Sequence, residues 1–304
     1  MSKESARAAV LDVGCFSAHL VVVEQERGLR RPVLSHKVRL RLDDAMDPSG
    51  RIERAGIERI ADAVAETTER LGDARPTLFV PYATSCVRDS ANVGQVVATV
   101  AERTGLRLRL LSGEREAQLS YVAAWRWFQP DGPLAVLDVG GGTVELAVGR
   151  TARPGFTRSL PIGARTLNRA GLDSRDQIPA LRDHLLRRID NALPDDVLAE
   201  FRLGHAVGCS KVFRQLAKLA GSRRLCRADL ETWIPRLAEL PPDRRAELRG
   251  ISRHRARQSL AGAVVADALM RATGHDVIDI SPWSTKEGLL LTLLCQLRDR
   301  DVAP

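Results

Sequence analysis

The sequence predicts an α/β fold of two related domains. The chain is 304 residues long, and at about 100–200 residues per domain this length corresponds to two domains. Apolar, strand-like runs alternate with segments of helical spacing along most of the chain. The third observation is an internal repeat, because residues 9–23 return in altered form as residues 135–149.

The repeat has the pattern of a β-hairpin with a tight turn. Residues 9–23 read AVLDVGCFSAHLVVV and residues 135–149 read AVLDVGGGTVELAVG, with six identical positions at the start. In each copy an apolar run leads to Asp-x-Gly and a second apolar run returns. Asp12 and Asp138 therefore stand at the mouths of equivalent turns. Two such hairpins, facing each other across a cleft, would surround one phosphate chain with backbone N–H groups and two carboxylates.

The elements predicted after the first hairpin alternate regularly between strands and helices. The strands are expected at 33–42, 77–83 and 106–111, and the helices at 52–71, 91–103 and 114–128. Ser112 is the expected N-cap of the last of these helices. A Pro/Gly cluster at 129–133 follows and marks a linker. We therefore expect domain I at residues 1–128 and domain II at residues 129–304.

The part of the chain after the second hairpin is predicted to be mainly helical. Helices are expected at 181–193, 211–219, 230–237 and 256–271, and a strand at 277–280. Pro235 falls inside the third of these helices and weakens that prediction. A final helix is expected from Trp283, and we expect it to pack back on domain I.

The composition excludes several classes of protein. Hydrophobic residues are 44% and charged residues 28%, which is ordinary for a folded soluble protein and excludes dominant disorder. No run approaches the roughly 20 apolar residues of a membrane span, and the first residues lack the apolar core of a signal peptide. The five cysteines are scattered without a Cys-x-x-Cys pair, which fits reduced thiols. We expect a cytoplasmic protein with no membrane partner.

The net charge of +8 comes almost entirely from arginine, with 41 arginines against five lysines. Two explanations stay open: the codon usage of a GC-rich genome, and a surface that binds a polyanion through bidentate arginine–phosphate pairs. Basic residues cluster at 30–41, 214–227 and 244–257. Aromatic residues are only 4% of the chain and are not interleaved with these clusters, so a base-stacking platform is not indicated. We expect no specific nucleic-acid partner.

Five further motifs resemble those of one family. They are Ala83-Thr-Ser-Cys-Val-Arg-Asp89, Leu111-Ser-Gly-Glu-Arg-Glu-Ala-Gln-Leu119, Ser159-Leu-Pro-Ile-Gly-Ala164, Leu260-Ala-Gly-Ala263 and Lys286-Glu-Gly-Leu289. In this order and spacing, and with the two hairpins, they resemble the Ppx/GppA family of exopolyphosphatases and guanosine pentaphosphate phosphohydrolases. That family lies in the actin-like, sugar-kinase and Hsp70 superfamily. The resemblance covers almost the whole chain and implies two actin-like (ribonuclease H-like) domains.

The resemblance also implies an activity. Residues 207–216 and 281–283 are most similar to the short actinobacterial form, which lacks an HD domain. Members remove the terminal phosphate of inorganic polyphosphate, of guanosine pentaphosphate, or of both, with Mg²⁺ or Mn²⁺. We therefore expect a homodimeric hydrolase whose partner is polyphosphate or a guanosine pentaphosphate or tetraphosphate. The choice between these substrates stays open.

Three carboxylates take their expected roles from this resemblance. Glu116, in the Ser-Gly-x-x-Glu-Ala pattern, would orient or deprotonate the attacking water. Asp138 and Glu145 lie at the two ends of one tight hairpin, where both can reach a single Mg²⁺.

The expected phosphate-binding residues lie on both hairpins and on two later loops. They are Gly14, Ser17, Arg88, Gly140, Gly141, Gly142, Thr143, Ser210 and Lys211. The glycine turns would offer backbone N–H groups, and Ser17 is the counterpart of Thr143. Lys211 begins a predicted helix, so its ammonium would act beside a helix N-terminus.

The first turn departs from the family pattern Gly-Ser-Asn-(Ser/Thr), because Cys15 and Phe16 replace two polar residues. The intact acidic set favours a working hydrolase. The Cys15–Phe16 pair favours the alternative, a weakly active or inactive member that senses guanosine tetra- or pentaphosphate or polyphosphate and acts through a partner. A kinase is disfavoured, since no adenosine-binding Gly-Gly segment follows residue 200. A redox gate at Cys15 is the least favoured reading, because a free cysteine usually packs without reacting.

Overall fold

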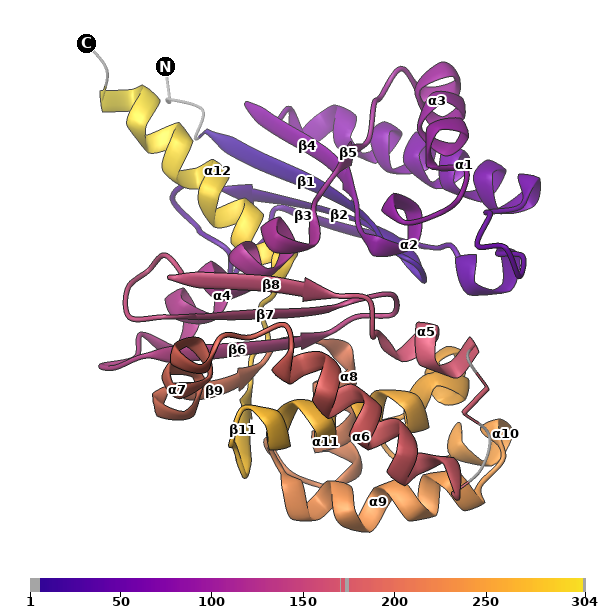
Figure 1. The fold of residues 1–304 in the computed structure, drawn as a ribbon. Helices are drawn as coiled ribbons and strands as arrows, with labels where there is room; N and C mark the ends of the chain where they lie inside the picture. Colours follow the sequence, from indigo (N-terminus) through magenta and orange to yellow (C-terminus); the bar gives the residue numbers. More distant parts are fainter. Residues whose placement is uncertain (1–5, 170, 173–174, 303–304) are drawn as a thin grey trace. The chain divides into compact units, whose positions relative to one another are not determined.

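The structure is a computed structural model that describes residues 6–169, 171–172 and 175–302. Its chain forms two units, each with its own sheet (Figure 1). Unit 1 takes the residues up to Ser112 together with those from Lys286 onward, and unit 2 is Gly113–Thr285.

Unit 1 is built on a five-stranded sheet. Its strands are β1 (Arg7–Val13), β2 (Ser17–Glu24), β3 (Leu34–Arg39), β4 (Leu78–Ala83) and β5 (Arg109–Leu110). They lie in the order β3-β2-β1-β4-β5. The first three strands are antiparallel neighbours, and β4 and β5 continue the sheet in parallel. Both β1 and β2 are apolar over most of their length, and alternate residues such as Leu11 and Leu20 belong to the face that packs on helices.

Helices cover that apolar face of unit 1 (Figure 1). The helical segments on this face are α1 (Arg54–Leu71), α2 (Ser85–Arg88), α3 (Val93–Thr104) and the 3₁₀ turns η1 (Leu42–Ala45) and η2 (Gly72–Ala74). Helix α12 (Thr285–Val302) also groups with unit 1, from Lys286 onward. In α1 the residues Ile57, Ile60 and Val64 recur at helical spacing, and all three are buried in the core of unit 1.

Unit 2 repeats the same strand pattern. Its strands are β6 (Leu134–Val139), β7 (Val144–Gly149), β8 (Phe156–Leu160), β9 (His205–Gly208), β10 (Arg224–Cys226) and β11 (Val277–Ile280). The sheet order is β10-β11-β9-β6-β7-β8. The path β8-β7-β6-β9-β11 matches β3-β2-β1-β4-β5 of unit 1 in both order and strand direction, and β10 is an added antiparallel edge.

Helices cover both faces of the second sheet. They are α4 (Gly113–Phe128), α5 (Ala164–Arg169), α6 (Gln177–Asp190), α7 (Asp195–Leu203), α8 (Lys211–Leu219), α9 (Arg227–Glu239), α10 (Pro242–Arg245), η3 (Arg253–Gln258) and α11 (Ser259–Ala272). Leu137 and Val139 of β6 join the large core that contains α6, α8 and α11. Leu134 and Val136, which alternate with them, pack on the opposite face against α4.

The predicted elements agree with the structure in most places, and the differences have local causes. The strand expected at 106–111 is reduced to the two residues of β5. The central strand β9 was not predicted, because four residues that include a glycine are too short to show periodicity. The helix expected at 181–193 ends at Asp190, and α7 begins after Pro194.

The units also divide at a different place from the expected boundary at residue 129. Helix α4 belongs to unit 2, because it packs on β6, β7 and β8. The last helix, from Lys286 onward, groups with unit 1. Among the helices that the structure describes, none combines the length and apolar character needed to cross a membrane.

The repeated aspartates occupy equivalent positions in the two sheets. Asp12 lies opposite His19 in the β1–β2 pair, and Asp138 lies opposite Glu145 in the β6–β7 pair. Burial raises the pKa of each aspartate to about 6. Each carboxylate is therefore held in an environment that disfavours its charge.

For Asp12 this shift predicts a pH-dependent stability. Between its ordinary pKa of 3.8 and about 6, the folded chain binds more protons than the unfolded chain, so stability falls as pH rises through this window and is constant above it. Asp12→Asn removes the effect. Since one pKa unit is about 1.4 kcal/mol, the variant should gain roughly 2–3 kcal/mol over the wild type between pH 3.5 and pH 7. Urea unfolding at a series of pH values measures this difference.

Asp47→Asn is the matched control, because hydrogen bonds from Ser49 and Arg51 lower the pKa of Asp47. Its stability difference from the wild type should change with pH in the opposite direction. A pH-independent difference for Asp12→Asn would contradict the burial of a charged Asp12.

Candidate active site

The second turn of the repeat presents free backbone donors. The N–H of Gly140 donates to the carbonyl of Thr143 at 2.9 Å and closes the turn. The carbonyls of Gly141 and Gly142 accept hydrogen bonds from the N–H groups of Arg165 (2.8 Å) and Gly163 (3.1 Å). Within the described ranges, the N–H groups of Gly141 and Gly142 donate to no protein acceptor. They are available to phosphate oxygens, and phosphate binding at this turn stays a prediction.

Gly163 is a required part of this turn that the sequence prediction missed. A Cβ atom at residue 163 would lie 2.5 Å from the carbonyl carbon of Gly142. Only glycine therefore allows the chain before α5 to approach the turn and tie its carbonyls. Gly163 stands in the Ser-Leu-Pro-Ile-Gly-Ala motif, but the sequence does not show that this glycine contacts the second turn, so it predicts no role for it.

Arg165 is a second residue that the sequence prediction missed. Its side chain is buried at 7% exposure. Its Nη1 atom lies 3.6 Å from the position that a Cβ of Gly141 would take. A guanidinium therefore packs directly on the second turn, where its planar set of donors suits a phosphate.

The two predicted metal ligands face one another across the second hairpin. Asp138 and Glu145 are directly opposite in the β6–β7 register, and Glu145 is buried. Ser159 of β8 lies opposite Glu145 and donates its hydroxyl to Oε1 of Glu145 at 3.0 Å. This hydrogen bond fixes the direction of the Glu145 carboxylate.

One face of α4 covers this acidic pair. A Cβ at Gly113 would lie 2.1 Å from the Ser159 hydroxyl oxygen, so the helix begins in direct contact with β8. Seven residues later, Ser120 donates its hydroxyl to Oδ2 of Asp138 at 3.1 Å. Glu116 lies between these contacts at helical spacing and is buried at 7% exposure. The predicted base is therefore on the helix face that meets both predicted metal ligands.

The Asp138 carboxylate is held by a short polar chain. Ser120 bonds both to Asp138 and to the hydroxyl of Thr285, at 3.0 Å, so the start of α12 belongs to this network. Burial is the largest cause of the raised pKa of Asp138, and the Ser120 hydrogen bond and the Arg214 charge act in the opposite direction. A cation beside Asp138 would favour its charged form in the same way.

The donor chemistry at this hairpin fits a magnesium ion. Asp138 and Glu145 supply hard oxygen ligands from opposing strands. In the part of the chain that the structure describes, no group of three or more His, Cys, Asp or Glu side chains is placed to hold a metal. A two-carboxylate site is typical of Mg²⁺, which keeps several waters and also binds substrate phosphates.

The first turn keeps the same backbone geometry despite Cys15 and Phe16. The N–H of Gly14 donates to the carbonyl of Ser17 at 3.0 Å, as Gly140 does to Thr143. The carbonyls of Cys15 and Phe16 accept from the N–H groups of Leu42 (2.8 Å) and Leu40 (3.0 Å). The Cys15 side chain packs against the core of unit 1. The departure from the family pattern therefore changes side chains and leaves the turn intact.

Two predicted phosphate ligands have structural partners. Arg88 pairs with Asp89 through Nε (2.7 Å) and Nη2 (3.0 Å), and its Nη1 donates to the Leu111 carbonyl at 2.7 Å. Ser210 is the N-cap of α8, where its hydroxyl oxygen accepts from the N–H groups of Val212 and Phe213. Lys211, at the start of α8, is exposed.

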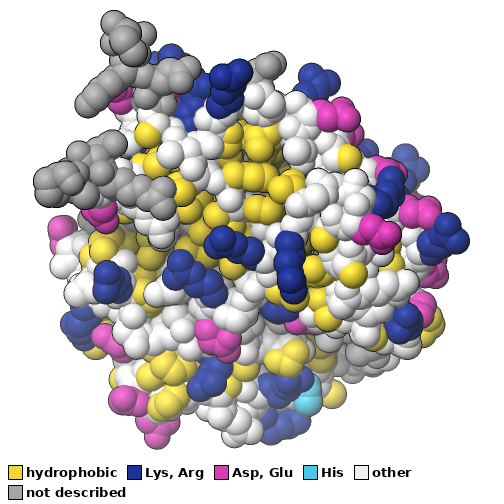
Figure 2. Space-filling model, turned by 90° about the horizontal axis from the view of Figure 1, so that it is seen from above, with side chains coloured by type: hydrophobic (Ala, Val, Ile, Leu, Met, Phe, Trp, Pro, Cys, Tyr) yellow, Lys and Arg dark blue, Asp and Glu magenta, His cyan; other side chains and the backbone are white. Residues whose placement is uncertain are grey.

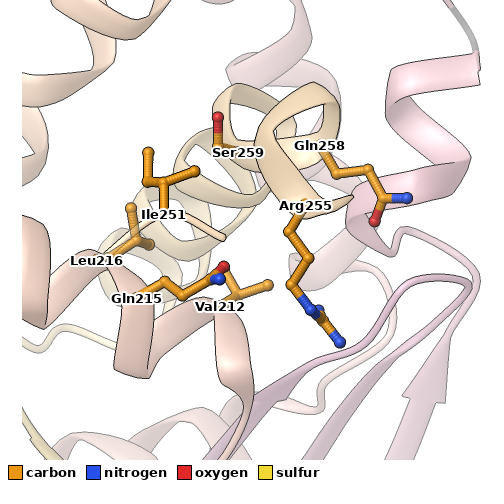
Figure 3. Close-up of a pocket in the computed structure, with 7 residues that line it drawn as sticks. All are labelled: Val212, Gln215, Leu216, Ile251, Arg255, Gln258 and Ser259. Atoms are coloured by element: carbon orange, nitrogen blue, oxygen red, sulfur yellow. The ribbon is translucent and has the colours of Figure 1, made fainter. Parts of the chain in front are cut away.

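A pocket lies beside α8 in unit 2 (Figure 3). Leu216 and Ile251 line one side of it and Arg255 the other. Its cavity volume is about 20 Å³, which is room for one water molecule. This pocket therefore has no space for a nucleobase.

Many arginines of the second and third basic clusters have structural roles. Arg224 pairs with Asp279, Arg227 with Asp276 and Arg244 with Glu247. Arg245 is buried and donates to the carbonyls of Leu237 and Leu240. On the face shown in Figure 2, basic and acidic side chains are interspersed. Three arginines of these two clusters are therefore paired with carboxylates, and Arg245 is engaged by backbone carbonyls.

The predicted site residues thus fall into two sets. Unit 2 brings together the three carboxylates and the second turn, and it also carries Ser210 and Lys211. Unit 1 carries Gly14, Ser17 and Arg88. Their roles in binding and catalysis stay predictions.

Comparison with known proteins agrees with this arrangement. The chain is 36% identical to exopolyphosphatase 1 of Mycobacterium leprae, over 95% of this chain and 89% of that protein. It is 26% identical to a guanosine-5'-triphosphate,3'-diphosphate pyrophosphatase of Aeromonas hydrophila, over 96% of this chain and 61% of that protein.

The solved structure of the Aquifex aeolicus PPX-GPPA enzyme superposes with a TM-score of 0.80 at 21% identity, over 95% of this chain and all of the other. The actin-like (ribonuclease H-like) topology expected for both domains is confirmed. The model of the Ppx/GppA phosphatase family matches residues 21–297. The chain belongs to the Ppx/GppA phosphatase family.

Proposed function

We propose that this protein hydrolyses the terminal phosphoanhydride of inorganic polyphosphate, with guanosine pentaphosphate as the second candidate substrate. The observation that carries the proposal is the face of α4. It places buried Glu116 between the Ser159–Glu145 contact and the Ser120–Asp138 contact. The relatives named exopolyphosphatase and guanosine-5'-triphosphate,3'-diphosphate pyrophosphatase support the same pair of substrates.

Each residue of this set has a distinct task in the proposed reaction. The N–H groups of Gly141 and Gly142 hold phosphate oxygens at the turn. Asp138 and Glu145 would hold Mg²⁺, which when bound neutralises charge on the phosphoanhydride. Glu116 accepts a hydrogen bond from a water molecule and orients it for in-line attack on the terminal phosphorus. The water oxygen bonds to the terminal phosphorus, its proton passes to Glu116, and the bridging P–O bond breaks, so that orthophosphate and a chain shorter by one phosphate are released.

The intact acidic set favours hydrolysis over the alternative of a purely sensing protein. Cys15 and Phe16 leave the hydrogen bonds of the first turn in place, so the substitution does not disrupt the turn backbone. Polyphosphate is placed first, because the relative named exopolyphosphatase 1 is more similar to this chain (36% identical) than the relative named guanosine-5'-triphosphate,3'-diphosphate pyrophosphatase (26% identical).

Phosphate release from both substrates, with and without Mg²⁺, is the test. We expect Mg²⁺-dependent release from polyphosphate and none in a chelator. Activity that persists in the chelator would contradict the assignment of Asp138 and Glu145. Release from guanosine pentaphosphate alone would reverse the order of substrates.

Glu116→Gln should keep substrate binding and lose nearly all turnover. The change is isosteric and removes only the carboxylate, and general acid–base groups contribute roughly 10²–10⁴-fold to rate. Steady-state phosphate release and a separate polyphosphate binding titration measure the two effects. Glu114→Gln, an exposed neighbour in the same turn of α4, is the control and should behave as the wild type. A Glu116→Gln protein with more than about a tenth of wild-type turnover would exclude Glu116 as the base.

Ser159→Ala should weaken metal binding while leaving the maximal rate close to that of the wild type. The change removes the hydrogen bond that fixes Glu145. Loss of such an outer partner typically costs about 10–100-fold in metal affinity. The measurement is the Mg²⁺ concentration for half-maximal activity. Ser222→Ala is the control, because it removes a hydroxyl that accepts a hydrogen bond from the Arg224 N–H. An unchanged Mg²⁺ requirement in Ser159→Ala would show that Ser159 does not position a metal ligand.

A further inference from the structure

Equivalent rows of side chains on the two hairpins differ in charge. In unit 2 the strand registers align Ser159, Glu145 and Asp138 across three strands. In unit 1 the same registers align Lys37, His19 and Asp12. Residues directly opposite in a sheet share one face, so each row is a line of neighbouring side chains. His19 therefore stands where unit 2 has the predicted metal ligand Glu145, and Lys37 stands where it has Ser159.

The next position along the third strand extends this difference. Arg39 of β3 lies directly opposite Ser17, the turn residue of unit 1. In unit 2, Leu160 lies opposite Val144. The next residue, Pro161, is therefore the counterpart of Arg39. The edge strand of unit 1 thus presents two cations beside its turn, and the edge strand of unit 2 presents none at these two positions.

The two cations are open to a ligand. Lys37 and Arg39 are both exposed. Neither forms an ion pair or a side-chain hydrogen bond with any residue that the structure describes. This differs from Arg88 of the same unit, whose guanidinium is engaged by Asp89 and the Leu111 carbonyl.

Two carboxylates and two further basic groups belong to the surroundings of this row. Asp12 ends the row, and Glu287 on α12 is paired with Lys286. The charges of Lys37, Lys286 and Glu287 all act on Asp12. His19 shares a hydrogen bond of 3.0 Å between its Nε2 atom and the Ser35 hydroxyl, which ties the ring to β3. Lys286 is paired with Glu287, whereas Lys37 and Arg39 form no ion pair with any residue that the structure describes, so these two cations can attract an anion although Asp12 lies in the same row.

We propose that Lys37 and Arg39 of the edge strand β3 are two further phosphate ligands beside the first hairpin, and that they bind phosphate without a metal ion. The inference rests on the proposed function and adds to it that the two hairpins bind different groups. The acidic row of unit 2 would hold a cation, and Lys37 and Arg39 of unit 1 would hold phosphate groups directly. It also gives part of the basic cluster at 30–41 a ligand.

The test is binding without metal. Inorganic tripolyphosphate, and polyphosphate of about 100 units, are titrated into the full chain in EDTA at low and high salt. Lys37→Met and Arg39→Met should each weaken binding about fivefold at low salt, and the double variant more than either. The loss should shrink at high salt, since the Debye length falls from about 10 Å at 0.1 M to about 3 Å at 1 M. Both residues are exposed on an edge strand, and circular dichroism confirms that each variant is folded.

Matched controls separate a local subsite from general charge. Arg70→Met in unit 1 and Lys218→Met in unit 2 remove exposed charges away from the turns and should leave binding unchanged. Wild-type binding that vanishes in EDTA, or a double variant that binds as the wild type, would overturn the inference. Loss of Mg²⁺-dependent hydrolysis with EDTA binding intact would instead overturn the proposed function and leave this subsite standing.

Discussion

The close approach of α4 to β8 is the constraint on which the proposed site depends. Residue 113 has no side chain, and any Cβ there would collide with Ser159. With glycine in place, the helix face that carries Glu116 and Ser120 lies on the acidic hairpin, where Ser120 bonds Asp138 and Ser159 bonds Glu145. The burial that follows raises the pKa of Asp138, which favours a ligand that restores positive charge nearby. Gly113 therefore allows both the contact of α4 with the acidic hairpin and the burial that raises the pKa of Asp138.

The two repeated hairpins share the backbone hydrogen bonds of their turns and differ in the side chains around them. Both turns close through the same N–H to carbonyl hydrogen bond, and both have their turn carbonyls tied by the segment that follows the third strand. The side chains around them have diverged, from Glu145 and Ser159 in unit 2 to His19 and Lys37 in unit 1. Backbone donors tolerate this change because they need no particular side chain. The same reason explains how Cys15 and Phe16 fit in the first turn.

Some arginines of unit 2 have a structural role. Asp267 is fully buried within α11, and Arg182 and Arg271 pair with it. Removing one partner of such a buried group typically costs about 3–5 kcal/mol, because a charge is left without compensation. Arg245 likewise satisfies two backbone carbonyls inside the unit. The excess of arginine is thus a poor guide to a ligand unless a residue is exposed and unpaired, as Lys37 and Arg39 are.

The sequence by itself determined the α/β class, the repeat and most of the long helices and strands, because apolar periodicity and glycine turns act over neighbouring residues. It also singled out Glu116, Asp138 and Glu145 through their motifs. Only the tertiary structure decided the partners of those residues. Ser159, Gly163, Arg165 and Thr285 lie far from them in sequence and gain their roles through contacts that no local pattern encodes. The domain boundary differed for the same reason: α4 follows unit 1 along the chain, but its apolar face is buried against the sheet of unit 2.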